Sequence, residues 1–107
     1  MESILITIKK MLGLDESYKV FDPELIIFIN TALMILSQVG LGRDGFMITG
    51  ESETWDEFLM DIDRFEGAKT YVYIRTRLAF DPPTNSSLLK SLEDTMRELE
   101  WRLNVKA

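Results

Sequence analysis

The sequence predicts an all-α domain of about four to five helices with one long glycine-rich loop. Apolar residues recur at helical spacing in successive segments, and capping residues, prolines and glycines separate these segments from one another. Only one stretch of strand-forming residues competes with the helical pattern. A chain of 107 residues has the length of one domain, so we expect a single domain over residues 1–107.

The first predicted helix covers residues 3–12. Lys9 and Lys10 lie in its last turn, where cations suit the helix dipole, and Gly13 is placed to end it. The second predicted helix begins with Asp22 as its cap and Pro23 in its first turn, and it stops at Gly40.

The second helix is apolar almost all the way round, yet it is too short to span a membrane, which takes about 18–20 apolar residues. One narrow polar stripe interrupts its surface, formed by Glu24, Asn30, Thr31, Ser37 and Gln38. It is either a central core helix or a helix with one side against another copy of the chain. A domain this small rarely surrounds one helix completely, which favours the oligomer.

Residues 40–53 form the long loop, which contains four of the six glycines. Its apolar run Phe46-Met47-Ile48 has two interpretations. In the first, Phe46 fills a gap in the core, and 46–48 forms a short strand or an irregular turn. In the second, the loop binds a partner, as long ordered loops in compact domains often do.

Thr54 and Glu57 form a capping box that opens a third helix over residues 54–65, with its apolar residues on one face. Its acidic face includes Asp61 and Asp63, but the other ligand positions of a calcium loop are missing, so we expect a solvated surface there.

Residues 68–80 alternate like a strand around Tyr71–Arg77, but their apolar residues also share one helical face. The absence of a partner strand favours a helix, which ends before Asp81-Pro82-Pro83. Arg75 and Arg77 on this helix either form a basic binding patch or pair with a nearby acidic face.

The last predicted helix starts at 85–87 and runs to about 104. Its leucines and Met96 follow the spacing of a helix-packing seam. Trp101 lies off that seam, beside Arg97 and Arg102, so it is either part of a second packing face or an anchor for a partner; we favour the anchor.

The composition excludes several classes of function. The chain has no cysteine and no histidine, so thiol chemistry, disulfides, Cys-ligated metals and histidine-based catalysis are excluded. We therefore expect no enzyme activity, no metal and no cofactor. The formal charge of −6 disfavours sequence-independent nucleic-acid binding and indicates a protein partner. No secretory signal is visible, so we expect a cytoplasmic protein when it is made.

Taken together, several features resemble the head–tail connector (adaptor) proteins of tailed bacteriophages and prophages. They are the Asp22-Pro23-Glu24 start, the apolar second helix, the Phe46–Ile48 loop, the Phe80–Pro83 stop and the Glu100–Leu103 end. The resemblance implies a structural virion protein that forms a ring of about a dozen copies beneath the portal protein and above the stopper or tail-completion protein.

The same resemblance implies that the ring lies in the virion neck, lines the passage for DNA without specific binding, and assembles in the bacterial cytoplasm with no membrane contact. It also implies that the terminal helix and the long loop meet portal and tail proteins. Together with the two arginines of the preceding helix, the predicted protein-interface residues are Phe46, Met47, Ile48, Arg75, Arg77, Trp101, Arg102 and Val105.

Two other classes of function compete with this interpretation. The first is a small acidic cytosolic regulator, or an antitoxin-like module that binds one basic partner. The second is an enzyme that uses carboxylates and a divalent metal, built from Glu51, Glu53, Asp56 and Asp61. Asp56 and Asp61 are five positions apart on one short predicted helix and therefore diverge, which disfavours the enzyme.

Overall fold

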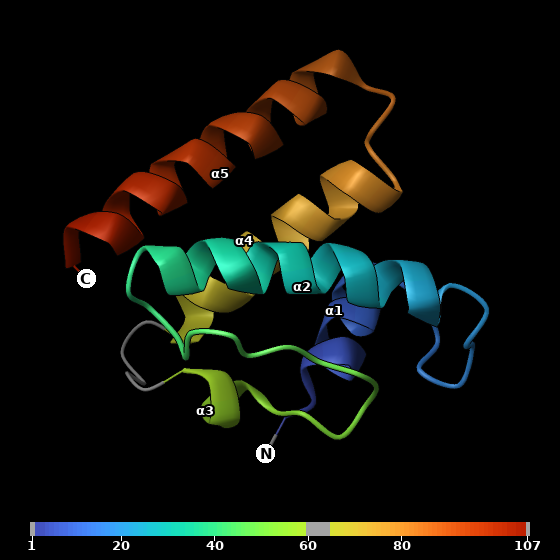
Figure 1. Ribbon diagram of the computed structural model, residues 1–107. Helices are drawn as coiled ribbons and strands as arrows, with labels where there is room; N and C mark the ends of the chain where they lie inside the picture. The colour runs from blue at the N-terminus through green and yellow to red at the C-terminus, as the bar shows by residue number, and fades with distance from the viewer. Residues whose placement is uncertain (1, 60–64, 107) are drawn as a thin grey trace.

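The computed structural model describes residues 2–59 and 65–106, without the side chains of residues 65 and 104–106. The predicted all-α class is confirmed over this part of the chain (Figure 1). The helices are α1 (Ile4–Met11), α2 (Asp22–Gln38), α3 (Trp55–Phe58), α4 (Phe65–Phe80) and α5 (Ser86–Lys106). The alternative of a short strand at 46–48 is wrong, because these residues form irregular loop. The β-type pairings found in the described residues are two isolated bridges, Ser3–Thr54 and Gly42–Leu59.

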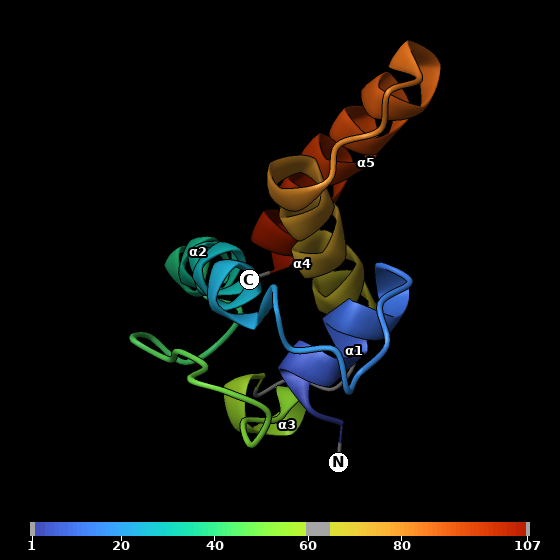
Figure 2. The ribbon, with the colours of Figure 1, turned by 90° about the vertical axis from the view of Figure 1, so that its right-hand side faces the viewer.

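Helix α4 occupies the centre of the fold. Helix α2 packs along it, α5 packs on it from another side, and α1 contacts both α2 and α4 (Figures 1 and 2). Consistent with this position, Tyr71, Val72 and Ile74 of α4 are buried. The interpretation of the second helix as the central core helix is therefore wrong. Its outer side leaves Ile27 64% and Met34 51% exposed, because the other helices cover only one side of α2.

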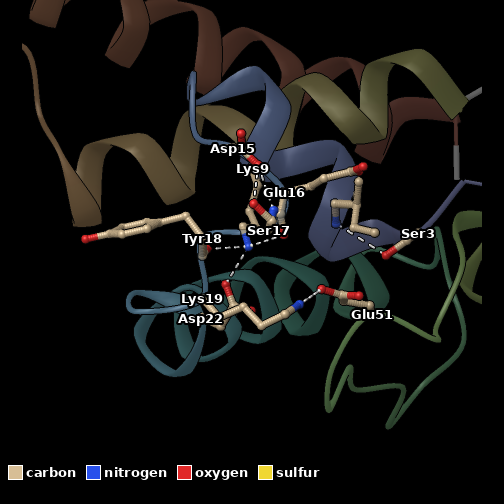
Figure 3. A network of polar contacts seen from close by, with 10 residues as sticks. Ser3, Lys9, Asp15, Glu16, Ser17, Tyr18, Lys19, Asp22 and Glu51 are labelled. Carbon is tan, nitrogen blue, oxygen red and sulfur yellow. Dashed lines mark hydrogen bonds and ion pairs between the residues drawn. The ribbon is translucent and has the colours of Figure 1, made fainter.

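The connection between α1 and α2 is held by the buried side chain of Lys9. Its Nζ donates to the carbonyl oxygens of Tyr18, at 2.7 Å, and of Glu16, at 3.0 Å. The same nitrogen lies 2.9 Å from Oδ1 of Asp22 (Figure 3). Asp22 was predicted to cap α2, but its carboxylate pairs with Lys9, and α2 begins without a side-chain cap.

Helix α3 begins as the sequence predicts, because the Glu57 carboxylate accepts a hydrogen bond of 2.8 Å from the N–H of Thr54. It ends at Phe58, whereas the prediction ran to residue 65; residues 60–64 of that prediction lie outside the described residues. The long loop causes this early end. The N–H of Arg43 donates to the carbonyl oxygen of Phe58 at 3.0 Å, and Leu59 is extended and bridges to Gly42.

Gly42 is required at this crossing. A Cβ on Gly42 would lie 2.3 Å from Cζ of Phe58, which is well inside van der Waals contact. The loop can therefore cross the end of α3 only where residue 42 has no side chain.

Helix α4 confirms the helical interpretation of residues 68–80 and ends before the two prolines. Helix α5 is capped by Asn85, whose Oδ1 accepts from the N–H groups of Ser87, at 2.8 Å, and Leu88, at 3.1 Å. Its Met96, Leu99 and Leu103 pack against the core. The first turns of α5 extend beyond the other helices (Figure 2).

Candidate interaction surfaces

The long loop is fixed against α2 by one polar side chain. Asn30 accepts a hydrogen bond of 2.8 Å from the N–H of Ile48 and donates one of 3.0 Å to its carbonyl oxygen. These two bonds act like one rung of a β-ladder and turn the Ile48 side chain into the core, where it is 1% exposed. Ile48 was predicted to contact a partner, but the fold places it in the interior of the subunit.

Glu53 organises the end of the same loop. Its carboxylate accepts hydrogen bonds from the N–H and hydroxyl of Thr49, at 3.0 and 2.7 Å, and from the N–H of Gly50, at 3.3 Å. Partial burial works to raise the pKa of Glu53, but these hydrogen bonds outweigh it and leave the pKa below its ordinary value. The Glu53 carboxylate is therefore ionised at neutral pH, the state in which it accepts these hydrogen bonds.

A groove of about 400 Å³ lies between α2 and this loop. Its apolar walls come from Met34, Phe46 and Met47, and Asp44 lies at its side. Met47 is 61% exposed, whereas Phe46 is half-buried against the ring of Phe58, with centroids 5.3 Å apart. The remaining lining residues are small or polar: Asn30, Thr31, Ser37, Gln38 and Gly45. Of the three predicted loop residues, Phe46 and Met47 therefore reach this surface.

The outer face of α5 is the second surface. Trp101 lies on the side of α5 away from the seam that faces α4, and it is 67% exposed. Arg97 lies one turn earlier on the same side, 3.4 Å from Asp94. Arg102 pairs with Glu98 at 3.2 Å, as its i,i+4 spacing predicts. The side chain of Val105, also predicted here, lies outside the described residues.

Arg75 joins α4 to α5 inside the subunit. Its Nη1 lies 3.2 Å from the Glu100 carboxylate and 3.3 Å from the hydroxyl of Tyr71, which itself donates to Glu100 at 2.7 Å. Burial, followed by the bond to Glu100, raises the pKa of Tyr71 to about 12, so the phenol remains a donor at neutral pH.

Arg77 is likewise engaged within α4, because it donates to the hydroxyl of Tyr73 at 3.0 Å. The structure thus shows internal pairing of both arginines, the alternative weighed from the sequence, and their role in a binding patch stays a prediction. The partners differ from those expected, since a tyrosine and a carboxylate of α5 take the place of an acidic face.

The carboxylates considered for metal-dependent chemistry do not converge. Glu51 pairs with Lys19, and Glu53 is occupied by the loop backbone (Figure 3 shows the first pair). Asp61 lies outside the described residues. Within residues 2–59 and 65–106, no group of three acidic side chains is arranged to hold a metal ion.

Two polar side chains have roles in the fold that the sequence did not predict, Asn30 and Lys9. Asn30 was placed in a polar stripe, but its two hydrogen bonds to the backbone of Ile48 were not anticipated. Asn30 shares this stripe with four other polar residues, so the sequence carries no signal that singles it out. The burial of Lys9 was not anticipated either, although its position four residues after Leu5 and three before Leu12 places it on the apolar face of the helix.

Comparison with protein families decides the identity of the chain. The model of a family described as "Phage connector protein" matches residues 4–107, which is nearly the whole sequence. The chain belongs to this phage connector family. Neither the curated proteins nor the solved structures gave a match in the corresponding searches.

Family membership confirms the resemblance found from the sequence and makes the connector a structural component of a phage. The connector leaves large apolar side chains exposed on two surfaces, the groove beside α2 and the outer face of α5. Over the described ranges, no helix of the connector is both long and apolar enough to cross a bilayer.

Proposed function

We propose that this connector forms a ring of about a dozen copies in the neck of a tailed-phage virion, where repeated head-to-tail contacts close the circle. The ring joins the portal protein above to a stopper or tail-completion protein below, and DNA passes through its centre. Its work is mechanical, and no catalytic step is assigned to any residue.

The observation that carries this proposal is the pair of unlike surfaces on one small connector subunit. The first is a groove with exposed Met34 and Met47, and the second is a convex helix face with exposed Trp101. A monomer with no partners gains nothing from leaving such side chains in water, since exposed apolar clusters mark interaction sites. A subunit that contacts neighbours on two sides needs two such surfaces.

The charge of the connector supports passage of DNA. The chain carries a formal charge of −6, so it neutralises few phosphates and offers little sequence-independent affinity. DNA can therefore slide through a ring of such subunits without being retained.

Quantitative mass spectrometry on purified phage particles tests this function. We expect the chain at about a dozen copies per particle, in heads that carry tails, as a closed ring requires. A phage in which the gene is interrupted should accumulate DNA-filled heads and separate tails, visible by electron microscopy.

Absence of the chain from particles, with abundant chain in the lysate, would contradict the proposal. That result would favour the cytosolic regulator, which should then be recovered as a stoichiometric complex with one target.

A further inference from the structure

We propose that Trp101 of one subunit inserts into the groove between α2 and the long loop of a neighbouring copy, with Arg97 facing Asp44 of that copy. This inference rests on the proposed ring and names the contact that closes it. The groove is the space of about 400 Å³ walled by Met34, Phe46 and Met47.

The two surfaces are unlike each other and lie on one chain. One is concave and belongs to α2 and the loop, and the other is convex and belongs to the outer face of α5. Contact between unlike surfaces of identical subunits is heterologous, and repeated rotation by the same angle produces a ring when the rotation closes on itself. Self-pairing of only one of the surfaces would instead stop at a dimer.

The charges of the two surfaces are complementary. Helix α5 contains four acidic and four basic residues, so the whole formal charge of −6 belongs to the rest of the chain. Near Trp101, Glu100 is turned inward to Arg75, and the described charges on the outside form two pairs, Arg97 with Asp94 and Arg102 with Glu98.

Asp44 supplies the opposite charge beside the groove. It makes no ion pair or hydrogen bond with another described residue, and Arg43 next to it does not line the groove. Arg97 pairs with Asp94 of its own helix at 3.4 Å, but both side chains are more than half exposed. Such a surface pair contributes little, so Arg97 can exchange Asp94 for Asp44 at small cost.

The groove suits a large aromatic side chain. Aromatic residues bury about 150–250 Å² each and are frequent anchors of interfaces. The thioethers of Met34 and Met47 adapt to the shape of a ring placed between them. The loop is already fixed by Asn30 and Glu53, so little conformational entropy is lost when the groove is filled.

The absence of cysteine from the sequence permits a clean crosslinking test. We would replace Arg97 and Asp44 together by cysteine in the phage, keep Trp101, and treat purified particles with a short bismaleimide. The matched control pairs Asp44→Cys with Lys90→Cys. Lys90 lies on the same side of α5, is 77% exposed, and is seven residues earlier, which places it about 10 Å away along the axis.

The expected result is a ladder of crosslinked dimers, trimers and larger multimers for the Arg97/Asp44 pair, with a several-fold weaker ladder for the Lys90/Asp44 pair. Adding Trp101→Ala to the first pair, measured on purified heads because this variant should not join heads to tails, should reduce several-fold the crosslinked fraction of the chains that those heads contain. Each single cysteine variant should give no multimer larger than a dimer.

Three results would overturn the inference while leaving the ring in place, provided mass spectrometry finds ring-level copy numbers. They are the absence of a ladder, a ladder that ends at dimers, and equal ladders from both pairs. Crosslinking of the groove to a different phage protein would also overturn it and assign the groove to that protein. If the chain is missing from particles altogether, the proposed function fails as well.

Discussion

Replacement of Lys9 by methionine should destabilise the subunit strongly, although Lys9 is neither catalytic nor on a binding surface. Its Nζ is completely buried and has three oxygen partners, the carbonyl groups of Glu16 and Tyr18 and the carboxylate of Asp22. Methionine keeps most of the volume of the side chain, so the substitution removes the charge and the donors without opening a large cavity.

The structure sets the size of the effect. Removing one member of a buried ion pair costs about 3–5 kcal/mol, because the remaining charge is left without compensation. The Asp22 side chain is 15% exposed and keeps some hydration, which places the expected loss at the lower end, about 3 kcal/mol. For a chain of this size, that loss lowers the melting temperature by roughly 10–20 °C.

Urea unfolding followed by far-ultraviolet circular dichroism measures this loss. Lys10→Met is the matched control, because Lys10 is the next residue, is 67% exposed, and lies 3.9 Å from Glu16. Its replacement should change the free energy of unfolding by no more than about 0.5 kcal/mol. The double variant Lys9→Met/Asp22→Asn should recover at least about 1 kcal/mol, because the uncompensated carboxylate is gone.

A loss below about 1 kcal/mol for Lys9→Met, or an equal loss for Lys10→Met, would refute the argument, since a buried, fully paired ammonium group cannot be so inexpensive to remove. Failure of the double variant to recover stability would show that lost packing, rather than the unpaired Asp22, dominates.

Three further predictions follow from other parts of the fold. Gly42→Ala should destabilise by about 1–3 kcal/mol in urea unfolding, because its methyl group would overlap the ring of Phe58, whereas Gly50→Ala, with no neighbour within 4 Å, should cost less than about 1 kcal/mol. The pKa of Glu53 is below its ordinary value of 4.5, so its carboxylate stabilises the fold above that pH, and this contribution is lost as the pH falls through the lowered pKa. The difference in unfolding free energy between wild type and Glu53→Gln should therefore shrink between neutral pH and about pH 3, and a constant difference would contradict this. Trp101→Ala should leave the isolated subunit folded, with a change of at most about 0.5 kcal/mol, yet block attachment of heads to tails in particles; unfolding of the variant would instead make Trp101 a core residue.

The local signals in the sequence predicted most of the helices. Thr54 with Glu57, Asn85, and the Pro82-Pro83 stop each act within a few residues of their own position, so the structure bears out the helix ends that they mark. The helical face of residues 68–80 also outweighed their strand-like alternation, because α2 and α5 supply partners for a helix on two sides.

The predictions failed where a distant segment competes for a local group. Asp22 has the sequence context of a helix cap, but Lys9 offers its carboxylate a buried ammonium group. The third helix stops at Phe58 because the backbone of the loop takes its carbonyl oxygen. Arg75 has the sequence context of an exposed arginine, but the packing of α5 against α4 places the Glu100 carboxylate 3.2 Å from it.

The candidate surfaces also contain one part that the local sequence predicted and one part that contacts with a distant segment decided. Trp101 was predicted as a partner-facing residue because it departs from the seam of its own helix, and helix periodicity alone places it outside. Sequence periodicity could not tell which residues of the loop run Phe46-Met47-Ile48 are exposed and which are buried, because no periodicity applies to an irregular loop. Asn30, on α2, decides that Ile48 is buried and Met47 is exposed.

The sequence by itself therefore determined the all-α class, the positions of most helix ends, the absence of cysteine and histidine chemistry, the negative charge, and the resemblance to phage connectors. These properties depend on composition and on interactions within one or two turns of helix. Only the tertiary structure decided that α4 is the central helix, that Lys9 pairs with Asp22, and that α2 and the loop enclose a groove. Each of these depends on which distant segments pack together, and the local sequence around a residue does not specify those contacts.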